Sequence, residues 1–306
     1  MPDRGRESLV AAASRGRILV SDGAWGTMLF RKGMARDYCP ELWCAERPEE
    51  VRGIAASYLA AGADLVGTNS FGGTRIRLAR RGLEARAREL NEAAARLSRE
   101  AVDRLGSAGE GKWVLGSMGP TGLRLATGEV GAEEMRAAFS EQAEALAKGG
   151  ADALCVETMM DAEEAAIAVR AAKEASGLEV ICTFTFDKTR EGLYRTMTGL
   201  SPEAAAVAAL DAGADIVGAN CGEGFADMIE VLRAMRPAAR GAPIMAQPNA
   251  GLPRTEGSSL VYPEGPDCAA ALAPALLEAG ASILGGCCGT TPEHIAAIRR
   301  AVDLRR

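Results

Sequence analysis

The sequence predicts an α/β fold, a single (β/α)8 TIM barrel, and two observations carry this prediction. A short unit, in which a helical stretch ends at glycine and an apolar strand begins within two residues, recurs four times. Four further apolar strands lie before or between these copies. Continuous apolar strands that alternate with helices are typical of a parallel sheet covered by helices. Eight such units in 306 residues suit a barrel of this kind.

The strands can be placed in chain order. The four copies of the repeat share a small-residue start and a short apolar run, and they are residues 61–69, 149–157, 212–220 and 279–287. The other four strands are expected at residues 18–22, 113–117, 180–186 and 243–247. Within the N-terminal segment 1–17, residues 8–15 are expected to form a short helix across the barrel floor. We find no internal linker, so residues 1–306 predict one domain.

The competing fold is an open doubly wound sheet. It would be favoured by a glycine fingerprint of the G-x-G-x-x-G kind after the first strand, and the sequence has none there. Composition agrees with a barrel core of Ala, Val, Leu and Ile, since 48% of residues are apolar and only 4% are aromatic. We therefore keep the barrel as the prediction.

Charge and hydropathy exclude several classes of partner. The net charge of −6 provides no sequence-wide basic field, so no nucleic-acid partner is expected. No stretch approaches the roughly 18 uninterrupted apolar residues of a membrane span, and the N-terminus lacks an apolar signal core. Eight cysteines in so long a chain do not indicate a disulfide scaffold. These features predict a cytoplasmic protein that does not bind a membrane.

Arginines gather in one segment of the chain. Two interpretations of this cluster stay open: it is a solvated helix face, or it is a docking surface for an acidic partner. Its members are Arg75, Arg77, Arg80, Arg81, Arg86 and Arg88.

In a barrel of this type the chemistry lies at the C-terminal ends of the strands. Cys221 ends the sixth predicted strand, and the adjacent Cys287 and Cys288 end the eighth between pairs of small residues. The two strand ends lie on one rim, so the three sulfurs can meet. Zinc takes thiolates in a tetrahedron, and a catalytic zinc site keeps three protein ligands and one exchangeable position. The spacing therefore predicts a zinc site at the C-terminal ends of the strands.

Other interpretations of the cysteines stay open from spacing alone. The adjacent pair is also compatible with ordinary packing, or with a vicinal disulfide or redox pair. Gly285-Gly286 also stands where many barrels bind phosphate, although cysteines are a poor choice for that role. Cys155 and Cys182 lie inside predicted strands and are expected in the core. The single histidine, His294, follows a helix-start signature, so histidine-based catalysis is not expected.

Two carboxylates also stand at strand ends, Asp22 after the first strand and Glu157 after the fourth. Two negative groups on one rim can hold an ammonium group, which suits an amino-acid substrate. The structural alternative is that each carboxylate caps loop amides. The sequence alone does not decide between these roles.

Together these strand ends resemble the homocysteine S-methyltransferase family. The similarity runs from about Ile18 to Ala301, and it rests on the segments 22–27, 68–71, 157–158, 220–221 and 285–290. The segment Pro248-Asn249-Ala250-Gly251-Leu252-Pro253 is most similar to the homocysteine module of cobalamin-dependent methionine synthase. It is less similar to the branches that use betaine or S-methylmethionine.

The resemblance implies a zinc barrel that methylates the sulfur of L-homocysteine to give methionine. By this resemblance Cys221, Cys287 and Cys288 bind zinc, and Asn249 is a weak fourth ligand that the substrate sulfur displaces. Its further implication concerns the rest of the substrate. Asp22 and Glu157 hold the amino group, and backbone amides around Gly23 and Ala24 bind the carboxylate.

The methyl donor is the point at which this sequence departs from the family pattern. Cobalamin-dependent methionine synthases carry folate- and cobalamin-binding modules on the same chain, whereas this chain stops at Arg306. The first expectation is methylcobalamin held by a separate corrinoid protein. The second is a free small donor such as S-methylmethionine or betaine, and the third is that the chain is an excised module. The oligomeric state and the exact thiol acceptor stay open.

Two rival functions come from different classes. One is a non-catalytic zinc-thiolate subunit of a corrinoid assembly, which the open fourth position argues against, because structural zinc sites are closed. The other is a barrel lyase or aldolase that uses Asp22 or Glu157 as its base. It predicts activity that survives the loss of Cys287.

Overall fold

The computed structural model of the protein describes residues 7–256 and 259–305. Its main sheet has eight strands, and every pair in it is parallel. They are β1 (Leu19–Val20), β2 (Leu65–Gly67), β3 (Trp113–Met118), β4 (Ala153–Met159), β5 (Glu179–Phe184), β8 (Ile216–Cys221), β9 (Ile244–Pro248) and β12 (Ile283–Leu284). β1 pairs with β12, and a bridge from Ser21 to Leu65 joins it to β2. The eight predicted strands and the barrel are confirmed.

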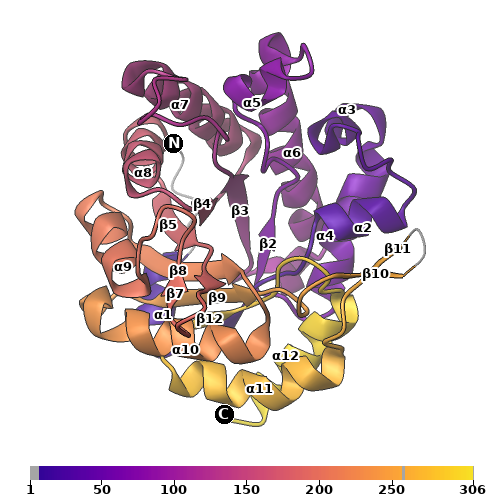
Figure 1. Ribbon diagram of the computed structural model, residues 1–306. Coiled ribbons are helices and arrows are strands. Elements are labelled where there is room, and N and C mark those ends of the chain that lie inside the picture. The colour runs from indigo at the N-terminus through magenta and orange to yellow at the C-terminus, as the bar shows by residue number, and fades with distance from the viewer. Residues whose placement is uncertain (1–6, 257–258, 306) are drawn as a thin grey trace.

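Helices surround the strands (Figure 1). The long ones are α4 (Pro48–Ala60), α6 (Ala87–Asp103), α7 (Ala132–Gly149), α8 (Ala162–Ser176), α9 (Pro202–Asp211), α10 (Phe225–Met235), α11 (Pro266–Glu278) and α12 (Pro292–Asp303). Shorter ones lie in the connections: α2 (Gly26–Arg31), α3 (Trp43–Glu46), α5 (Arg75–Ala79), η1 (Pro40–Leu42), η2 (Glu84–Arg86), η3 (Gly106–Gly109) and η4 (Arg236–Ala239). Within the described ranges, no helix combines the length and the apolarity that crossing a bilayer requires.

The predicted floor helix is present as α1 (Leu9–Ser14). Leu9, Ala12 and Ala13 pack into one buried cluster with inward-facing side chains from all eight strands. The helix is fixed at its N-terminus, where a Glu179 carboxylate oxygen on β5 accepts a hydrogen bond from the Leu9 amide at 2.9 Å. A carboxylate is favourable at this position because the first amides of a helix have no partner within it. The barrel is therefore closed at its lower end.

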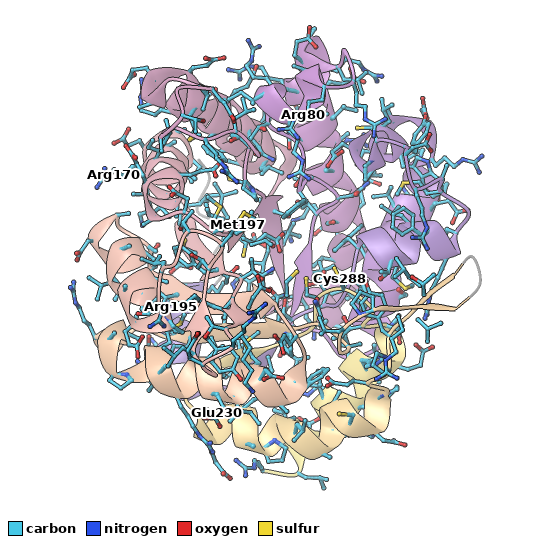
Figure 2. All side chains as sticks on the ribbon, in the orientation of Figure 1. Arg80, Arg170, Arg195, Met197, Glu230 and Cys288 are labelled. Carbon is cyan, nitrogen blue, oxygen red and sulfur yellow. The ribbon has the colours of Figure 1, made fainter. Side chains whose placement is uncertain are left out.

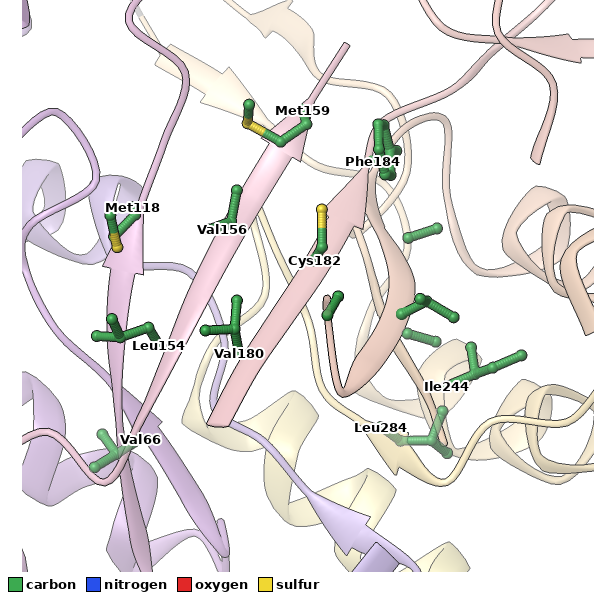
Figure 3. Packing of buried hydrophobic residues seen from close by; sticks show 14 of the residues in the cluster. Val66, Met118, Leu154, Val156, Met159, Val180, Cys182, Phe184, Ile244 and Leu284 are labelled. Carbon is green, nitrogen blue, oxygen red and sulfur yellow. The ribbon is translucent and has the colours of Figure 1, made fainter. Parts of the chain in front are cut away.

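The strand residues alternate between two buried layers. Inward residues such as Cys155 and Met245 join the floor cluster, whereas Leu154, Cys182 and other outward residues pack against the helices. Figure 3 shows part of this outer layer along β4 and β5. The alternation follows from the two-residue period of a strand, and burial on both faces explains why the strands are continuously apolar. The expected core positions of both cysteines are confirmed.

The aspartate of the sequence repeat has one structural role in three copies. It stands just before a strand, and its carboxylate accepts a hydrogen bond from a backbone amide in the preceding neighbouring strand. The bonds join Asp64 to Val20 at 3.0 Å, Asp152 to Val114 at 2.8 Å and Asp215 to Val180 at 2.7 Å. The backbone amide of each aspartate also donates to the carbonyl of the same partner. The repeat therefore fixes the register between neighbouring strands.

Two hairpins lie in the loops that follow barrel strands. They are β6 (Asp187–Lys188) with β7 (Tyr194–Arg195), and β10 (Arg254–Glu256) with β11 (Ser259–Val261). The sequence did not predict them. Strands of two or three residues are too short to show a periodic apolar pattern.

Candidate metal and substrate site

A cavity of about 630 Å³ opens at the C-terminal ends of the barrel strands. Its wall contains seven of the eight predicted site residues, which are Asp22, Gly23, Ala24, Glu157, Cys221, Cys287 and Cys288. The eighth, Asn249, is buried after β9. The fold therefore brings together strand ends as far apart in the sequence as Asp22 and Cys288.

The three predicted cysteines form one cluster. All their sulfur atoms lie within 4.8 Å of one another, and the Cys221 and Cys287 sulfurs are 3.0 Å apart. Glycines allow the loop after β12 to approach this closely. A Cβ atom on Gly285 would lie 2.7 Å from the Asp22 carbonyl oxygen, and one on Gly286 would lie 2.4 Å from the Thr290 hydroxyl. The spacing of the sulfurs is that of a common metal site, without a disulfide.

The backbone is strained beside this cluster. Cys221 and Thr158 have φ angles of 60° and 61°, in the left-handed region that residues other than glycine seldom adopt. Asn220 supports both segments. Its side-chain oxygen accepts a hydrogen bond from the Thr158 backbone amide at 2.8 Å, and its side-chain nitrogen lies 3.8 Å from the Cys287 sulfur. Such strain persists where surrounding contacts hold it, and it concentrates at functional sites.

Asn249 provides an oxygen atom without a partner. Its side-chain amide donates to the Gly222 carbonyl at 2.6 Å, which fixes the orientation of the group. Its carbonyl oxygen is buried and, in the described part of the chain, accepts no hydrogen bond. A buried oxygen in this state carries a free-energy cost of about 1–3 kcal/mol. A metal ion bound by the neighbouring thiols would give this oxygen a partner.

The sulfur chemistry points the same way. Hydrogen bonds from Cys221 and Cys287 lower the pKa of Cys288 to about 3. The hydrogen bond between Cys287 and Cys221 raises the pKa of Cys287 well above 9. Neighbouring thiols oppose one another's ionisation unless a cation lies between them. Three clustered thiols therefore fit a catalytic zinc ion, which takes three protein ligands and keeps one exchangeable position. The assignment of the Asn249 oxygen to that position stays a prediction.

The two predicted carboxylates lie in the same cavity, each bound to neutral donors. Asp22 accepts from the Gly67 amide at 2.7 Å and the Trp25 indole at 2.9 Å. Glu157 accepts from the Ser117 hydroxyl. Burial raises the pKa of Asp22 to about 6 and that of Glu157 to about 7. Neither carboxylate makes an ion pair with any described residue, so the cavity holds two acidic groups that have no cationic partner in contact with them.

The predicted carboxylate donors show a mixed picture. Gly23 lies against Thr290 and Tyr58, and a Cβ atom on it would be 2.7 Å from the Thr290 hydroxyl. The Ala24 amide already donates to that hydroxyl at 3.1 Å. To bind a substrate carboxylate, Ala24 would have to exchange this bond. The role of Gly23 and Ala24 stays a prediction.

Sequence reasoning assigned no role to three residues that support the site, although Trp25 and Asn220 lie in segments that carry the family resemblance. Ser117, Asn220 and Trp25 hold the carboxylates and thiols in place. Each stands at or just after the end of a strand, which is the signal that could have marked them, but strand ends alone do not reveal a partner. His294 caps the first turn of α12 through Thr291, as its helix-start signature predicted.

Comparisons with known proteins agree with this geometry. Residues 19–302 match the sequence model of the family described as homocysteine S-methyltransferase. Methionine synthases from Mycobacterium tuberculosis and Mycobacterium leprae are each 37% identical, over 299 and 300 residues. Both alignments cover 94% of this chain, but only 25% and 24% of the relatives. The chain thus spans about a quarter of the length of these curated relatives.

Solved structures show the same relation. The metallated form of the Escherichia coli homocysteine methyltransferase MmuM has a TM-score of 0.78 and 27% identity, with 95% of this chain and 99% of that chain covered. Its apo form gives 0.72 and 26%, with coverages of 93% and 95%. A methyltransferase from Methanosarcina mazei shares the fold, at 14% identity and a TM-score of 0.60 over 96% and 97% of the two chains. This chain belongs to the homocysteine S-methyltransferase family.

Proposed function

We propose that this chain moves a methyl group to the sulfur of L-homocysteine and so forms methionine. One observation carries the proposal: three clustered thiols, and two carboxylates that make no ion pair with any described residue, line a single cavity. Thiols suit a metal that binds the substrate sulfur, and the carboxylates suit the substrate ammonium group. Within this proposal residues 1–306 act as one homocysteine-binding domain in the cytoplasm.

Cys221, Cys287 and Cys288 would hold a zinc ion, with Asn249 as the exchangeable fourth ligand. A bound zinc ion supplies a thiolate at neutral pH, because it deprotonates a coordinated thiol whose ordinary pKa is near 8.5. The Asn249 side chain is held only through its NH2 group, which donates to the Gly222 carbonyl. The Asn249 oxygen could therefore leave the zinc ion without breaking that hydrogen bond. Asn220 keeps the Cys287 sulfur in position.

Asp22 and Glu157 orient the substrate. Ionised carboxylates bind an ammonium group through charge-assisted hydrogen bonds, which are shorter and stronger than neutral ones. Trp25, Gly67 and Ser117 fix the two carboxylates, so the substrate carbon chain is directed toward the thiols. This positioning matters because the reacting sulfur and methyl carbon must approach to about 3–3.5 Å.

The transfer itself is a displacement at carbon. The homocysteine sulfur forms a bond to the methyl carbon, and the bond from that carbon to the donor breaks with its electron pair staying on the donor. The thiol proton has already passed to solvent. We propose methylcobalamin on a separate corrinoid protein as the donor, following the resemblance of the segment 248–253 to cobalamin-dependent methionine synthase. Free S-methylmethionine or betaine is the alternative donor.

Zinc-edge X-ray absorption with and without L-homocysteine tests this proposal. We expect three sulfur ligands in the free protein and four with homocysteine. Cys287→Ala should lose most of the zinc and all methyl transfer. Cys268→Ala is the matched control, because this cysteine lies on α11, away from the cavity, and it should keep both.

Two results would overturn the assignment. One is a protein that binds no zinc, and the other is a zinc shell that homocysteine leaves unchanged. The second result would favour a non-catalytic zinc-thiolate subunit. A fourth sulfur ligand would direct the next assays to methyl donors, with free methylcobalamin first.

A further inference from the structure

The arginine cluster divides into two groups. Three members are neutralised by acidic side chains: Arg75 pairs with Glu141 at 2.6 Å, Arg86 with Glu89 at 2.6 Å and Arg88 with Glu144 at 2.9 Å. The other three, Arg77, Arg80 and Arg81, make no ion pair with any described residue, and they line the cavity together with Arg36. We call these four the mouth arginines. Three of them are exposed and Arg77 is half-buried, so they lie at the outer edge of the cavity.

Two of the mouth arginines are held in fixed positions. Arg77 lies over the Phe71 ring, with 5.0 Å between the guanidinium carbon and the ring centroid, and donates to the Pro120 carbonyl at 3.0 Å. Arg80 donates to the Gly122 carbonyl at 2.9 Å. A guanidinium group has five N–H donors, so most donors of both side chains are left for another acceptor.

Glycines make room for this arrangement. A Cβ atom on Gly119 would lie 2.5 Å from the Phe71 ring, and one on Gly122 would lie 2.9 Å from an Arg80 nitrogen. Gly122 also has a φ of +73°, which favours glycine. The loop after β3 is therefore shaped around the two arginines.

The nearest acids are already occupied. One Glu41 carboxylate oxygen accepts from the Gly72 amide at 2.7 Å, and the other accepts from the Cys39 thiol at 3.1 Å. Glu164 accepts from the Thr121 amide at 2.7 Å. Burial lowers the pKa of Arg77, and the nearby charges of Glu41 and Glu164 offset this only in part.

A second surface groove shows the opposite pattern. It has a volume of about 750 Å³ and lies along α4 and α6. Its arginines are paired with acids, since Arg52 contacts Glu100 at 2.7 Å and Arg96 contacts the same carboxylate at 2.9 Å. The arginines of the cavity mouth therefore differ from those of this groove in having no acidic partner among the described residues.

The mouth arginines and the thiols belong to one cavity, and Figure 2 labels Arg80 beside α5 and Cys288 after β12. The inner part takes the sulfur and ammonium group of homocysteine under the proposed function. A methyl donor has to reach that sulfur from the outer side. The rest of the donor would then face the mouth of the cavity, where these arginines lie.

We propose that Arg77 and Arg80, with Arg36 and Arg81, form an oxyanion subsite that binds the carboxylate or phosphate group of the methyl donor. This inference rests on the proposed function for the identity of the ligand. The small donors S-methylmethionine and betaine carry a carboxylate, and methylcobalamin carries a phosphodiester. Bidentate guanidinium groups recognise both kinds of oxyanion.

Inorganic phosphate is the probe for the subsite itself. It is titrated calorimetrically into the zinc-loaded full chain saturated with L-homocysteine, which occupies the inner part. We expect R77Q/R80Q to weaken phosphate binding at least about tenfold, since two charge-assisted bonds are lost. R86Q/R88Q removes the same charge from ion-paired arginines and should change it less than about twofold. Equal binding by R77Q/R80Q and wild type would overturn the subsite.

Donor kinetics identify the source of the oxyanion. Methylcobalamin, S-methylmethionine and betaine are compared as donors. For the donor that supports turnover, R77Q/R80Q should raise its KM at least about tenfold and leave the KM of homocysteine unchanged. A raised KM for homocysteine with an unchanged donor KM contradicts the inference, because the arginines would then bind the amino acid.

The two proposals fail in different ways. Absence of homocysteine binding in wild type overturns the proposed function, and phosphate titration of the zinc-loaded protein alone still reports on the arginines. Normal homocysteine binding with phosphate binding that ignores R77Q/R80Q overturns only the subsite. Thermal unfolding of both double variants confirms that they are folded.

Discussion

The two ends of the barrel differ in how their acidic side chains are compensated. At the strand starts, Asp64, Asp152 and Asp215 each accept a backbone amide and each contact a lysine or arginine. At the strand ends, Asp22 and Glu157 accept hydrogen bonds from neutral groups alone among the described residues. Acidic side chains at the strand starts are paired with cations, whereas Asp22 and Glu157 at the strand ends are not.

This difference separates stability from function. Burying a carboxylate is costly unless a cation or several hydrogen bonds compensate it. The acids at the strand starts have that compensation and hold strands in register. The acids at the strand ends have no cationic partner, and burial raises the pKa of Asp22 to about 6 and that of Glu157 to about 7. A cationic ligand would supply the missing charge, and barrel enzymes bind their substrates at this end.

Glu157→Gln tests the upper half of the comparison most strongly. We expect the Kd for L-homocysteine to rise about 10- to 100-fold, because a charge-assisted hydrogen bond contributes about 1.5–3 kcal/mol. The midpoint of thermal unfolding of the ligand-free protein should not fall, since a desolvated charge is removed. Calorimetric titration measures the Kd. The zinc content serves as the control and should stay at the wild-type level.

The opposite outcome would show that Glu157 has a structural role and does not bind the substrate. If Glu157→Gln lowers the unfolding midpoint by several degrees and leaves the Kd unchanged, the carboxylate caps Ser117 and does not bind substrate. Asp22→Asn is the companion variant. The asparagine oxygen can still accept the hydrogen bonds from the Gly67 amide and the Trp25 indole N–H.

The pH dependence of binding sharpens the same comparison. Asp22 and Glu157 have raised pKa values in the free protein, so they are partly protonated near neutral pH and must lose those protons to bind ammonium. Affinity therefore rises with pH and levels off above the pKa values. With values of about 6 and about 7, the increase from pH 6 to pH 8 is about 20-fold.

L-norleucine is the ligand for this experiment, because it has the ammonium group of homocysteine without a thiol that titrates. In Glu157→Gln only Asp22 remains, and the increase from pH 6 to pH 8 should fall to about twofold. A flat profile in the wild type would show that the carboxylates are not the ammonium site.

The fold was predictable because its signal repeats along the chain. Four copies of one unit gave four strands, and the continuous apolar runs gave the other four. The repeat also contained the aspartates, yet their purpose was not visible in the sequence. Each aspartate contacts an amide that lies 35–44 residues earlier in the chain, and only the closed sheet brings the two together.

The site was predictable to the extent that residue type limits its chemistry. Adjacent cysteines between glycines have few uses, so Cys287 and Cys288 could be marked without a structure. The unpaired state of Arg77 and Arg80 could not, since Arg86 and Arg88 look the same in the sequence. Arg88 is reached by a glutamate from another helix, which only the packing decides, whereas Arg86 pairs with Glu89 three residues later. No acid is in place to pair with Arg77 or Arg80 among the described residues.

Asp215→Asn tests the lower half of the comparison and has the smallest expected effect. It removes the ion pair with Lys173 at 2.8 Å and weakens the bond to the Val180 amide at 2.7 Å. The pair is about a third exposed, so the loss should be about 1 kcal/mol. In a chain of this length that lowers the unfolding midpoint by about 2 °C.

Substrate binding should be untouched by that change. The Kd for L-homocysteine and the zinc content of Asp215→Asn should equal those of wild type, because the substituted carboxylate lies at the opposite end of the strands. Lys173→Met is the matched control: it removes the cation and keeps the amide bond, so its midpoint should fall less. A tenfold change in homocysteine Kd in Asp215→Asn would show that the two ends of the barrel are coupled, and the division between stability below and binding above would then not hold.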